Sequence, residues 1–208
     1  MSPDRSVEEY HISKTRLESL VDGIFAFAMT ILVLSIGQPS IPQAQAAALI
    51  PKYISGLFPE LLLFVIAFLV LASFWLEHHR QFHFVRTVDL GILWLNIAIL
   101  IFTVLIPFST DFSGNYNYIQ SAVVIFHINL LMIGVLFLLH WAYLTKHHDL
   151  ADPNLDSYTK KRRFFWLATL PVCSLIGIAV SFISPQDSFY SYAIPLIVFI
   201  ILRIRKTE

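Results

Sequence analysis

Residues 16–34 read RLESLVDGIFAFAMTILVL, an apolar run with a single acid, Asp22, beyond its first turn. An α-helix crosses the roughly 30 Å hydrocarbon core of a bilayer with about 20 mostly apolar residues. The run therefore predicts a membrane-spanning helix over about 17–36. An acid inside a span is costly and usually faces a partner or water. The alternative for Asp22 is that its side chain reaches the nearby interface.

The rest of the chain has the same character. Its 208 residues are 57% hydrophobic and 13% charged, whereas soluble domains carry about 25% charge. Further apolar runs predict helices at about 58–79, 90–108, 119–144, 164–183 and 189–202. The expected fold is an all-α integral membrane protein, with six transmembrane helices in one domain over residues 1–208. A β-barrel is disfavoured because these runs are apolar at even and odd positions alike.

Basic residues predict the orientation of the chain. Thirteen of the 14 Lys and Arg residues lie in the N-terminal arm, the second and fourth connections and the C-terminal tail, and only Lys52 lies on the other side. Cytoplasmic segments carry an excess of Lys and Arg, so both termini are expected in the cytoplasm. The fourth connection, about Thr145–Arg163, is expected to be a polar linker. Acidic and basic residues balance at 14 each, so no net charge attracts the protein to nucleic acid. The apolar runs predict the lipid bilayer as its partner.

Two stripes run along the first predicted helix. Small residues recur at Ser19, Gly23, Ala26 and Thr30, and such stripes permit close helix packing in lipid. Large apolar residues recur beside them at Phe27, Ile31 and Leu34. Taken alone, both stripes predict packing surfaces. Leu32 is about 140° from Phe27 on an ideal helix and is expected to face away from it.

Candidate metal and catalytic residues are few. His79 and His83 have the i, i+4 spacing of zinc ligands on a helix, but a zinc site needs further ligands that the surrounding sequence hardly offers. His127 and His140 stand thirteen residues apart in one predicted helix, and a bis-histidine haem would need a matching second helix. The single cysteine, Cys173, has no neighbouring base. We therefore expect no enzyme, no resident metal and no cofactor.

Four segments in order resemble a known family. Arg16-x-x-x-Leu20-Val21-Asp22 resembles R-x-x-x-F-S-D, the first-helix signature of TMEM175-type potassium channels. The segments FWLEHHR at 74–80, WLN at 94–96 and IPF at 106–108 are similar to the second and third helices of that family. The resemblance covers about the first 110 residues. Leu20-Val21 replaces Phe-Ser of the motif, which removes a hydroxyl from its polar network.

The resemblance implies a passive, leak-like potassium-selective channel without the T-V-G-Y-G filter, a pentapeptide that this sequence lacks. Prokaryotic members have one six-helix repeat and work as tetramers, so it implies a homotetramer in a prokaryotic inner membrane, with the first helix lining the pore. Phe27, Ile31 and Leu34 would then form a hydrophobic gate. Thr30 would contribute to ion selectivity, with potassium as the permeant ion.

The resemblance also implies a packed polar cluster near the cytoplasmic ends of the first three helices. Its members are Arg16, Asp22, Trp75, His78, His79 and Asn96. The cluster is expected to hold the pore helices in register rather than to bind ions. The alternatives are a proton-conducting channel of the same architecture, a secondary transporter and, least favoured, a histidine-metal membrane enzyme. A transporter would show inverted repeats, broken helices or midplane charges, none of which the sequence suggests.

Overall fold

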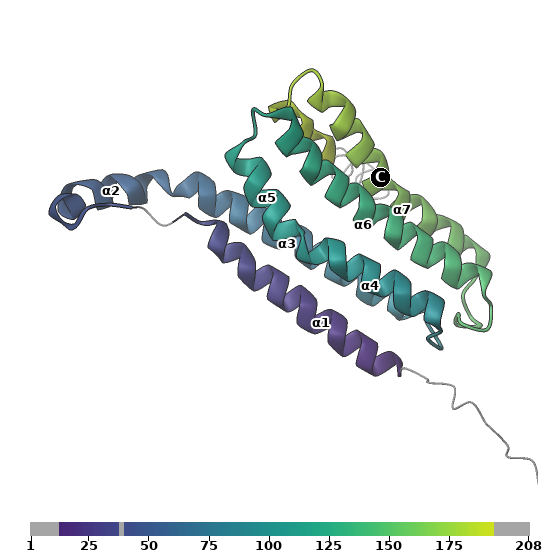
Figure 1. The fold of residues 1–208 in the computed structure, drawn as a ribbon. Helices are drawn as coiled ribbons and strands as arrows, with labels where there is room; N and C mark the ends of the chain where they lie inside the picture. The colour runs from purple at the N-terminus through teal and green to yellow at the C-terminus, as the bar shows by residue number, and fades with distance from the viewer. Residues whose placement is uncertain (1–12, 38–39, 194–208) are drawn as a thin grey trace, which may run out of the picture.

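The computed structural model describes residues 13–37 and 40–193, and this part of the chain is helical almost throughout (Figure 1). The α-helices are α1 Lys14–Ile31, α2 Ala46–Gly56, α3 Phe58–Phe82, α4 Leu90–Val104, α5 Ile106–Asn115, α6 Gln120–Lys146 and α7 Ser157–Ser181. Short 3-10 segments follow at η1 Leu32–Ser35, η2 Gln43–Gln45 and η3 Gln186–Tyr192. Among the described residues, four stretches are long and apolar enough to cross a membrane: Lys14–Ser35, Leu90–Asn115, Gln120–Lys146 and Ser157–Ser181.

The all-α membrane fold is thus confirmed, and α3 covers the second predicted span. Of the predicted sixth helix, 189–202, residues 194–202 lie outside the described residues. Within the described part, residues 189–192 belong to the 3-10 segment η3.

The third predicted span differs from the expectation of one unbroken helix ending near 108. The helix is interrupted at Leu105 and resumes as α5, which continues to Asn115. Pro107 stands in the first turn of α5, where its missing N–H and its ring prevent an i to i−4 hydrogen bond with α4. The expectation that the sequence contains no broken helix is therefore wrong at this position.

The α7 helix begins earlier than predicted, at Ser157 instead of about 164, so the expected linker 145–163 shortens to residues 147–156. The Asp156 carboxylate caps the helix by accepting hydrogen bonds from the Thr159 N–H at 2.8 Å and from its hydroxyl at 2.7 Å. The backbone hydrogen bond is the main cause that lowers the pKa of Asp156 below its ordinary value. The first two turns of α7 are polar, so hydropathy alone misses them.

The first outer connection forms a separate helix, α2, which projects beyond the bundle (Figure 1). It contains Pro51 and has no buried residue. This helix has 11 residues and is joined to α3 through Leu57.

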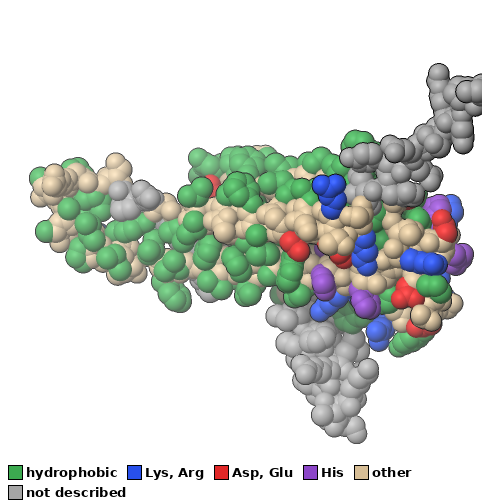
Figure 2. Space-filling model, turned by 90° about the horizontal axis from the view of Figure 1, so that it is seen from below, with side chains coloured by type: hydrophobic (Ala, Val, Ile, Leu, Met, Phe, Trp, Pro, Cys, Tyr) green, Lys and Arg blue, Asp and Glu red, His purple; other side chains and the backbone are tan. Residues whose placement is uncertain are grey.

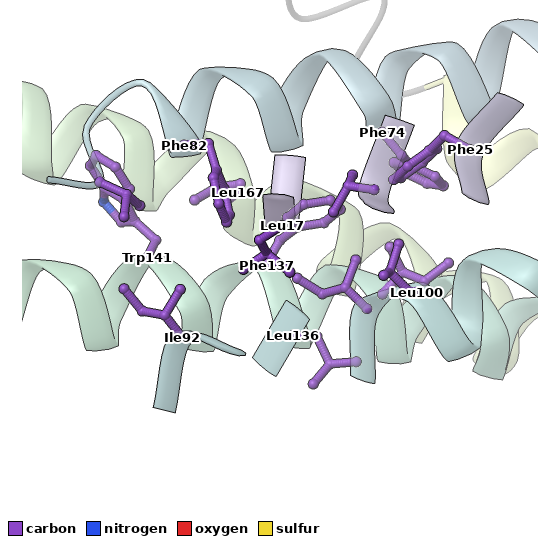
Figure 3. Close-up of a cluster of buried hydrophobic side chains, with 14 of the residues drawn as sticks. Leu17, Phe25, Phe74, Phe82, Ile92, Leu100, Leu136, Phe137, Trp141 and Leu167 are labelled. Carbon is purple, nitrogen blue, oxygen red and sulfur yellow. The ribbon is translucent and has the colours of Figure 1, made fainter. Parts of the chain in front are cut away.

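The core lies where α1, α3, α4, α6 and α7 meet (Figure 3). Its labelled side chains are Leu17, Phe25, Phe74, Phe82, Ile92, Leu100, Leu136, Phe137, Trp141 and Leu167. The α6 and α7 helices approach each other closely at Gly134, where an added Cβ would lie 2.7 Å from Pro171 Cδ. Burial of large apolar side chains and this close contact hold the bundle together.

Charged and histidine side chains gather at one end of the bundle, and the rest of the visible face is mostly apolar (Figure 2). At this end the connections after α3 and α6 pair with each other: Arg86 N–H donates to Leu150 O at 2.7 Å, and Asp152 N–H donates to Phe84 O at 2.9 Å. The Lys14 ammonium donates to Val85 O at 2.8 Å, which joins the start of α1 to the same end.

Candidate pore face of the first helix

One side of α1 belongs to the core of the chain. Leu17, Val21, Phe25 and Ala28 are buried, and they face α3, α4 and α5. Leu32, in the following 3-10 segment, is also fully buried. It points away from Phe27, as predicted, but it is a core residue, so its substitution cannot serve as a neutral control.

The opposite side of α1 is not covered by residues 13–37 and 40–193. At about 100° per residue, the exposed side chains span an arc of roughly 160°. The centre of this arc is the small stripe Ser19, Gly23, Ala26 and Thr30, all of which are exposed. A Cβ added at Gly23 would meet nothing within 4 Å. The small residues therefore serve no close packing within the chain itself.

The large apolar residues lie along one edge of this arc. Phe27 is 59% exposed and Leu34 is 76% exposed, while Ile31 beside them is half-buried. The alternative in which Phe27 packs against α3 does not match its exposure in the single chain. The helix tightens to 3-10 geometry after Ile31, so Leu34 stands on a narrower, steeper turn than the other two residues.

Thr30 is exposed near the middle of the arc, and its hydroxyl donates to Phe27 O at 2.8 Å. A threonine hydroxyl has one donor and two acceptor lone pairs. With its hydrogen committed to the backbone, the Thr30 oxygen presents its lone pairs outward. Such an oxygen can coordinate a cation that loses part of its hydration shell.

The predicted polar cluster divides into an exposed and a buried part. In the exposed part, the Trp75 indole N–H donates to Asp22 Oδ1 at 2.7 Å, and the Trp75 ring stacks on His79 with centroids 6.1 Å apart. Asp22 thus has a hydrogen-bond partner on α3. This bond joins α1 to α3, across 53 residues of sequence.

The buried part joins α3 to α4. His78 Nε2 and Asn96 Oδ1 are 2.5 Å apart, and Asn96 Nδ2 donates to Ile92 O at 2.9 Å. Because Asn96 uses its amide nitrogen as the donor to the backbone, its oxygen accepts and His78 Nε2 carries the hydrogen. His78 also stacks on Phe82 at 4.3 Å. Arg16 is exposed and, within residues 13–37 and 40–193, forms no ion pair and no side-chain hydrogen bond.

The structure also shows polar contacts that the sequence did not predict. Arg163 of α7 donates to Glu77 of α3 at 3.0 Å, and Arg80 lies 3.8 Å from the same carboxylate. His140 Nδ1 and Gln81 Oε1 are 2.7 Å apart. The only signal for the first contact was opposite charge at the same predicted membrane face, 86 residues apart.

The remaining histidines do not assemble a metal centre in the part of the chain that the structure describes, where no three His, Cys, Asp or Glu side chains are placed to hold an ion. His83 packs edge-on against Phe84. His127 is hydrogen-bonded through both ring nitrogens, to the Tyr192 hydroxyl at 2.7 Å and to Ser188 Oγ at 2.8 Å.

The chain resembles known proteins in sequence. The family model described as "Endosomal/lysosomal potassium channel TMEM175" matches residues 16–107. A potassium channel of Chamaesiphon minutus is 31% identical over 181 residues, which cover 81% of this chain and 84% of the relative. The chain belongs to the TMEM175 family. A second TMEM175 relative, a potassium channel of Streptomyces collinus, is 27% identical over 172 residues, or 79% of this chain and 81% of that protein.

Solved TMEM175 structures have the same fold. A crystal structure titled as a lysosomal potassium-selective channel TMEM175 homolog from Chamaesiphon minutus matches with a TM-score of 0.72 and 26% identity, over 91% of this chain and 97% of that one. A variant of the potassium channel MtTMEM175, bound to a nanobody–MBP fusion, matches with a TM-score of 0.65 over 100% of this chain and 99% of that one, and at 17% identity it supports the fold alone.

All ten residues predicted for the gate, the selectivity position and the polar cluster lie within the matched TMEM175 segment, 16–107. The resemblance found in the first 110 residues is thus confirmed as family membership. The roles of the individual residues stay predictions.

Proposed function

We propose that this TMEM175 chain is a passive potassium-selective channel, assembled as a homotetramer in a prokaryotic inner membrane with both termini in the cytoplasm. The observation that carries the proposal is the exposed face of α1, which the described part of the chain, residues 13–37 and 40–193, leaves without a neighbour. Its relatives are named potassium channels, and membership in a channel family agrees with the expectation that the protein is not an enzyme. Six spans per chain remain part of the proposal.

Orientation follows from charge. Lys and Arg side chains gather at one end of the bundle (Figure 2), and the positive-inside rule assigns this end to the cytoplasm. Lys52 lies on α2, in the first connection, which this orientation assigns to the outer side of the membrane.

In the proposed tetramer, four copies of α1 surround the axis. The small stripe lets neighbouring α1 helices approach closely, since small residues permit backbone contact. Phe27, Ile31 and Leu34 then form apolar rings, and a hydrophobic constriction closes by dewetting without a mobile lid. Four Thr30 oxygens replace part of the hydration water of potassium as it passes.

The polar cluster has a supporting role in this proposal. The Asp22–Trp75 bond joins α1 to α3, and the His78–Asn96 bond joins α3 to α4. Because the Asp22–Trp75 bond holds one side of α1 against α3, it restricts the rotation of α1 about its own axis. That rotation decides whether Phe27 at the edge of the exposed arc points into the pore.

The test is ion flux in liposomes. Purified protein is compared with Phe27→Asn, which wets the proposed gate, and with Phe182→Asn, the same change at a 74% exposed position at the end of α7. We expect Phe27→Asn to raise potassium flux and Phe182→Asn to leave it unchanged. Unchanged conductance and open probability in Phe27→Asn would place the gate elsewhere. Flux that requires a counter-transported proton or sodium ion would reject the channel in favour of a transporter, and flux of protons alone would favour the proton channel.

A further inference from the structure

A groove of roughly 470 Å³ opens at the charged end of the α6–α7 hairpin. It is lined by Trp141 and Thr145 of α6 and by Lys160, Lys161, Phe164, Phe165 and Ala168 of α7. The hairpin lies on the far side of the bundle from α1, with α3 and α4 between them (Figure 1). Whatever lies against α1, the groove faces outward from the bundle.

The lining of the groove changes from charged to apolar along the axis of α7. Lys160, Phe164 and Ala168 follow one another at i, i+4 and i+8, so they stand on one face of α7 over about 12 Å. Lys161 and Phe165 repeat the pattern one position later. The groove is therefore cationic at the end of the bundle and apolar toward its middle.

The four consecutive basic side chains at 160–163 make different contacts. Arg163 turns inward, where it pairs with Glu77 at 3.0 Å and lies over the Phe84 ring at 5.1 Å. Arg162 lies over the Tyr158 ring at 5.6 Å. The two lysines line the groove instead, and neither has a carboxylate oxygen within 4.0 Å among residues 13–37 and 40–193.

We propose that this groove is a binding site for an anionic phospholipid of the cytoplasmic leaflet. The lipid phosphate lies between Lys160 and Lys161, and the first part of an acyl chain runs along Phe164, Phe165 and Ala168. The charge selects an anionic headgroup, because the choline group of a zwitterionic lipid would bring a further cation to the two lysines. The apolar half selects a lipid over a free phosphate, since a free phosphate would leave Phe165, 71% exposed, uncovered. The proposal needs the membrane orientation but not channel activity.

Native mass spectrometry of the purified full-length protein tests the site, with phosphatidylglycerol and phosphatidylcholine of identical acyl chains. We expect phosphatidylglycerol to bind more tightly. Lys160→Gln/Lys161→Gln should weaken phosphatidylglycerol binding on the order of 30-fold, the effect of two lysines at an anionic membrane surface, and should leave phosphatidylcholine binding unchanged. The matched control Arg86→Gln/Arg162→Gln removes the same charge from the same end of the molecule and should retain the preference.

Three results would overturn the proposal. Equal binding of the two lipids would remove the headgroup preference. Equal loss in both double variants would reduce the effect to net charge. Displacement of phosphatidylglycerol by glycerol 3-phosphate at the same concentration would assign the groove to free phosphate. If the lysine variant does not fold, Ala168→Trp decides the question: it fills the apolar half with both lysines intact, and unaltered lipid binding in that variant would contradict the proposed acyl-chain path.

Discussion

The helices α1 and α6 are both long and apolar, but the chain buries them to different degrees. Over 18 apolar residues of each membrane-spanning stretch, 50% are buried in α6 and 28% in α1 with the following 3-10 segment, Lys14–Ser35. The α6 helix contacts α4, α5 and α7, whereas α1 packs on α3, α4 and α5 along one side only. The difference indicates that α6 completes the core of a single chain and that α1 presents a surface to something outside it.

Glycines show the same difference at atomic scale. A Cβ at Gly134 of α6 would lie 2.7 Å from Pro171 Cδ, whereas a Cβ at Gly23 of α1 would meet nothing within 4 Å. Small residues on these two membrane-spanning helices therefore have different reasons to be small. On α6 the reason lies within the chain, and on α1 it lies, by the proposed assembly, in a neighbouring copy.

The largest expected effect comes from replacing the phenylalanines on the two sides of α1, one at a time, with alanine. Phe25→Ala should lower the free energy of unfolding by about 3–5 kcal/mol, because a fully buried phenyl ring is replaced by a cavity. Phe27→Ala, two residues away and 59% exposed, should change it by less than about 0.5 kcal/mol while raising basal potassium flux. Unfolding followed by circular dichroism and flux in liposomes measure the two. Comparable destabilisation by both substitutions would show that Phe27 packs inside the folded chain.

The next largest effect is expected from substitutions at Gly134 of α6 and Gly23 of α1. Gly134→Val should destabilise the chain by about 1–3 kcal/mol, since the added side chain collides with the Pro171 ring and forces α6 and α7 apart. Gly23→Val should leave the unfolding of the chain unchanged and should reduce tetramer formation, measured by size exclusion and crosslinking in mild detergent. A Gly23→Val protein that assembles as the wild type does would remove the small stripe from the subunit interface.

The contrast between α1 and α6 also explains which features the sequence could predict. Helical periodicity correctly placed Leu32 opposite Phe27, but both sides of α1 are apolar, so composition could not show which side the chain covers. Hydropathy located the apolar part of α7 but missed its polar first turns, which the Asp156 cap begins. Pro107 is visible in the sequence, yet the continuation of α5 past residue 108 was not, because its serines, threonine and aspartate lower the hydropathy.

Long-range polar contacts were the hardest features to predict. The Asp22–Trp75 bond was anticipated only through the family motif, which grouped these residues without their geometry. The Glu77–Arg163 pair has no motif and joins residues far apart in sequence. Periodicity assigns a residue to a face of its own helix, but it does not determine which helix lies against that face.

The polar cluster provides a smaller test of the same contrast. Asn96→Ala should cost about 1–3 kcal/mol, because it leaves the buried His78 Nε2–H without an acceptor. Arg16→Ala, at an exposed position of α1, should cost no more than about 0.5 kcal/mol. Chemical unfolding in detergent measures both. If Arg16→Ala proves as costly as Asn96→Ala, Arg16 has a partner that residues 13–37 and 40–193 of the single chain do not provide.

The smallest expected effect is on selectivity. Thr30 and Thr103 both donate their hydroxyls to a backbone carbonyl at 2.8 Å, but Thr30 is exposed on α1 and Thr103 is fully buried in α4. Thr30→Ala removes the outward oxygen from each of four proposed subunits without disturbing the core. It should lower the ratio of potassium to sodium permeability by about two- to tenfold, the equivalent of a net hydrogen bond of ~0.5–1.5 kcal/mol. Thr103→Ala removes the same group away from the proposed pore and should leave the ratio unchanged. Reversal potentials under bi-ionic conditions measure both variants. An unchanged ratio in Thr30→Ala, or an equal decrease in the two, would show that the selectivity of the channel does not depend on the uncovered face of α1 at this position.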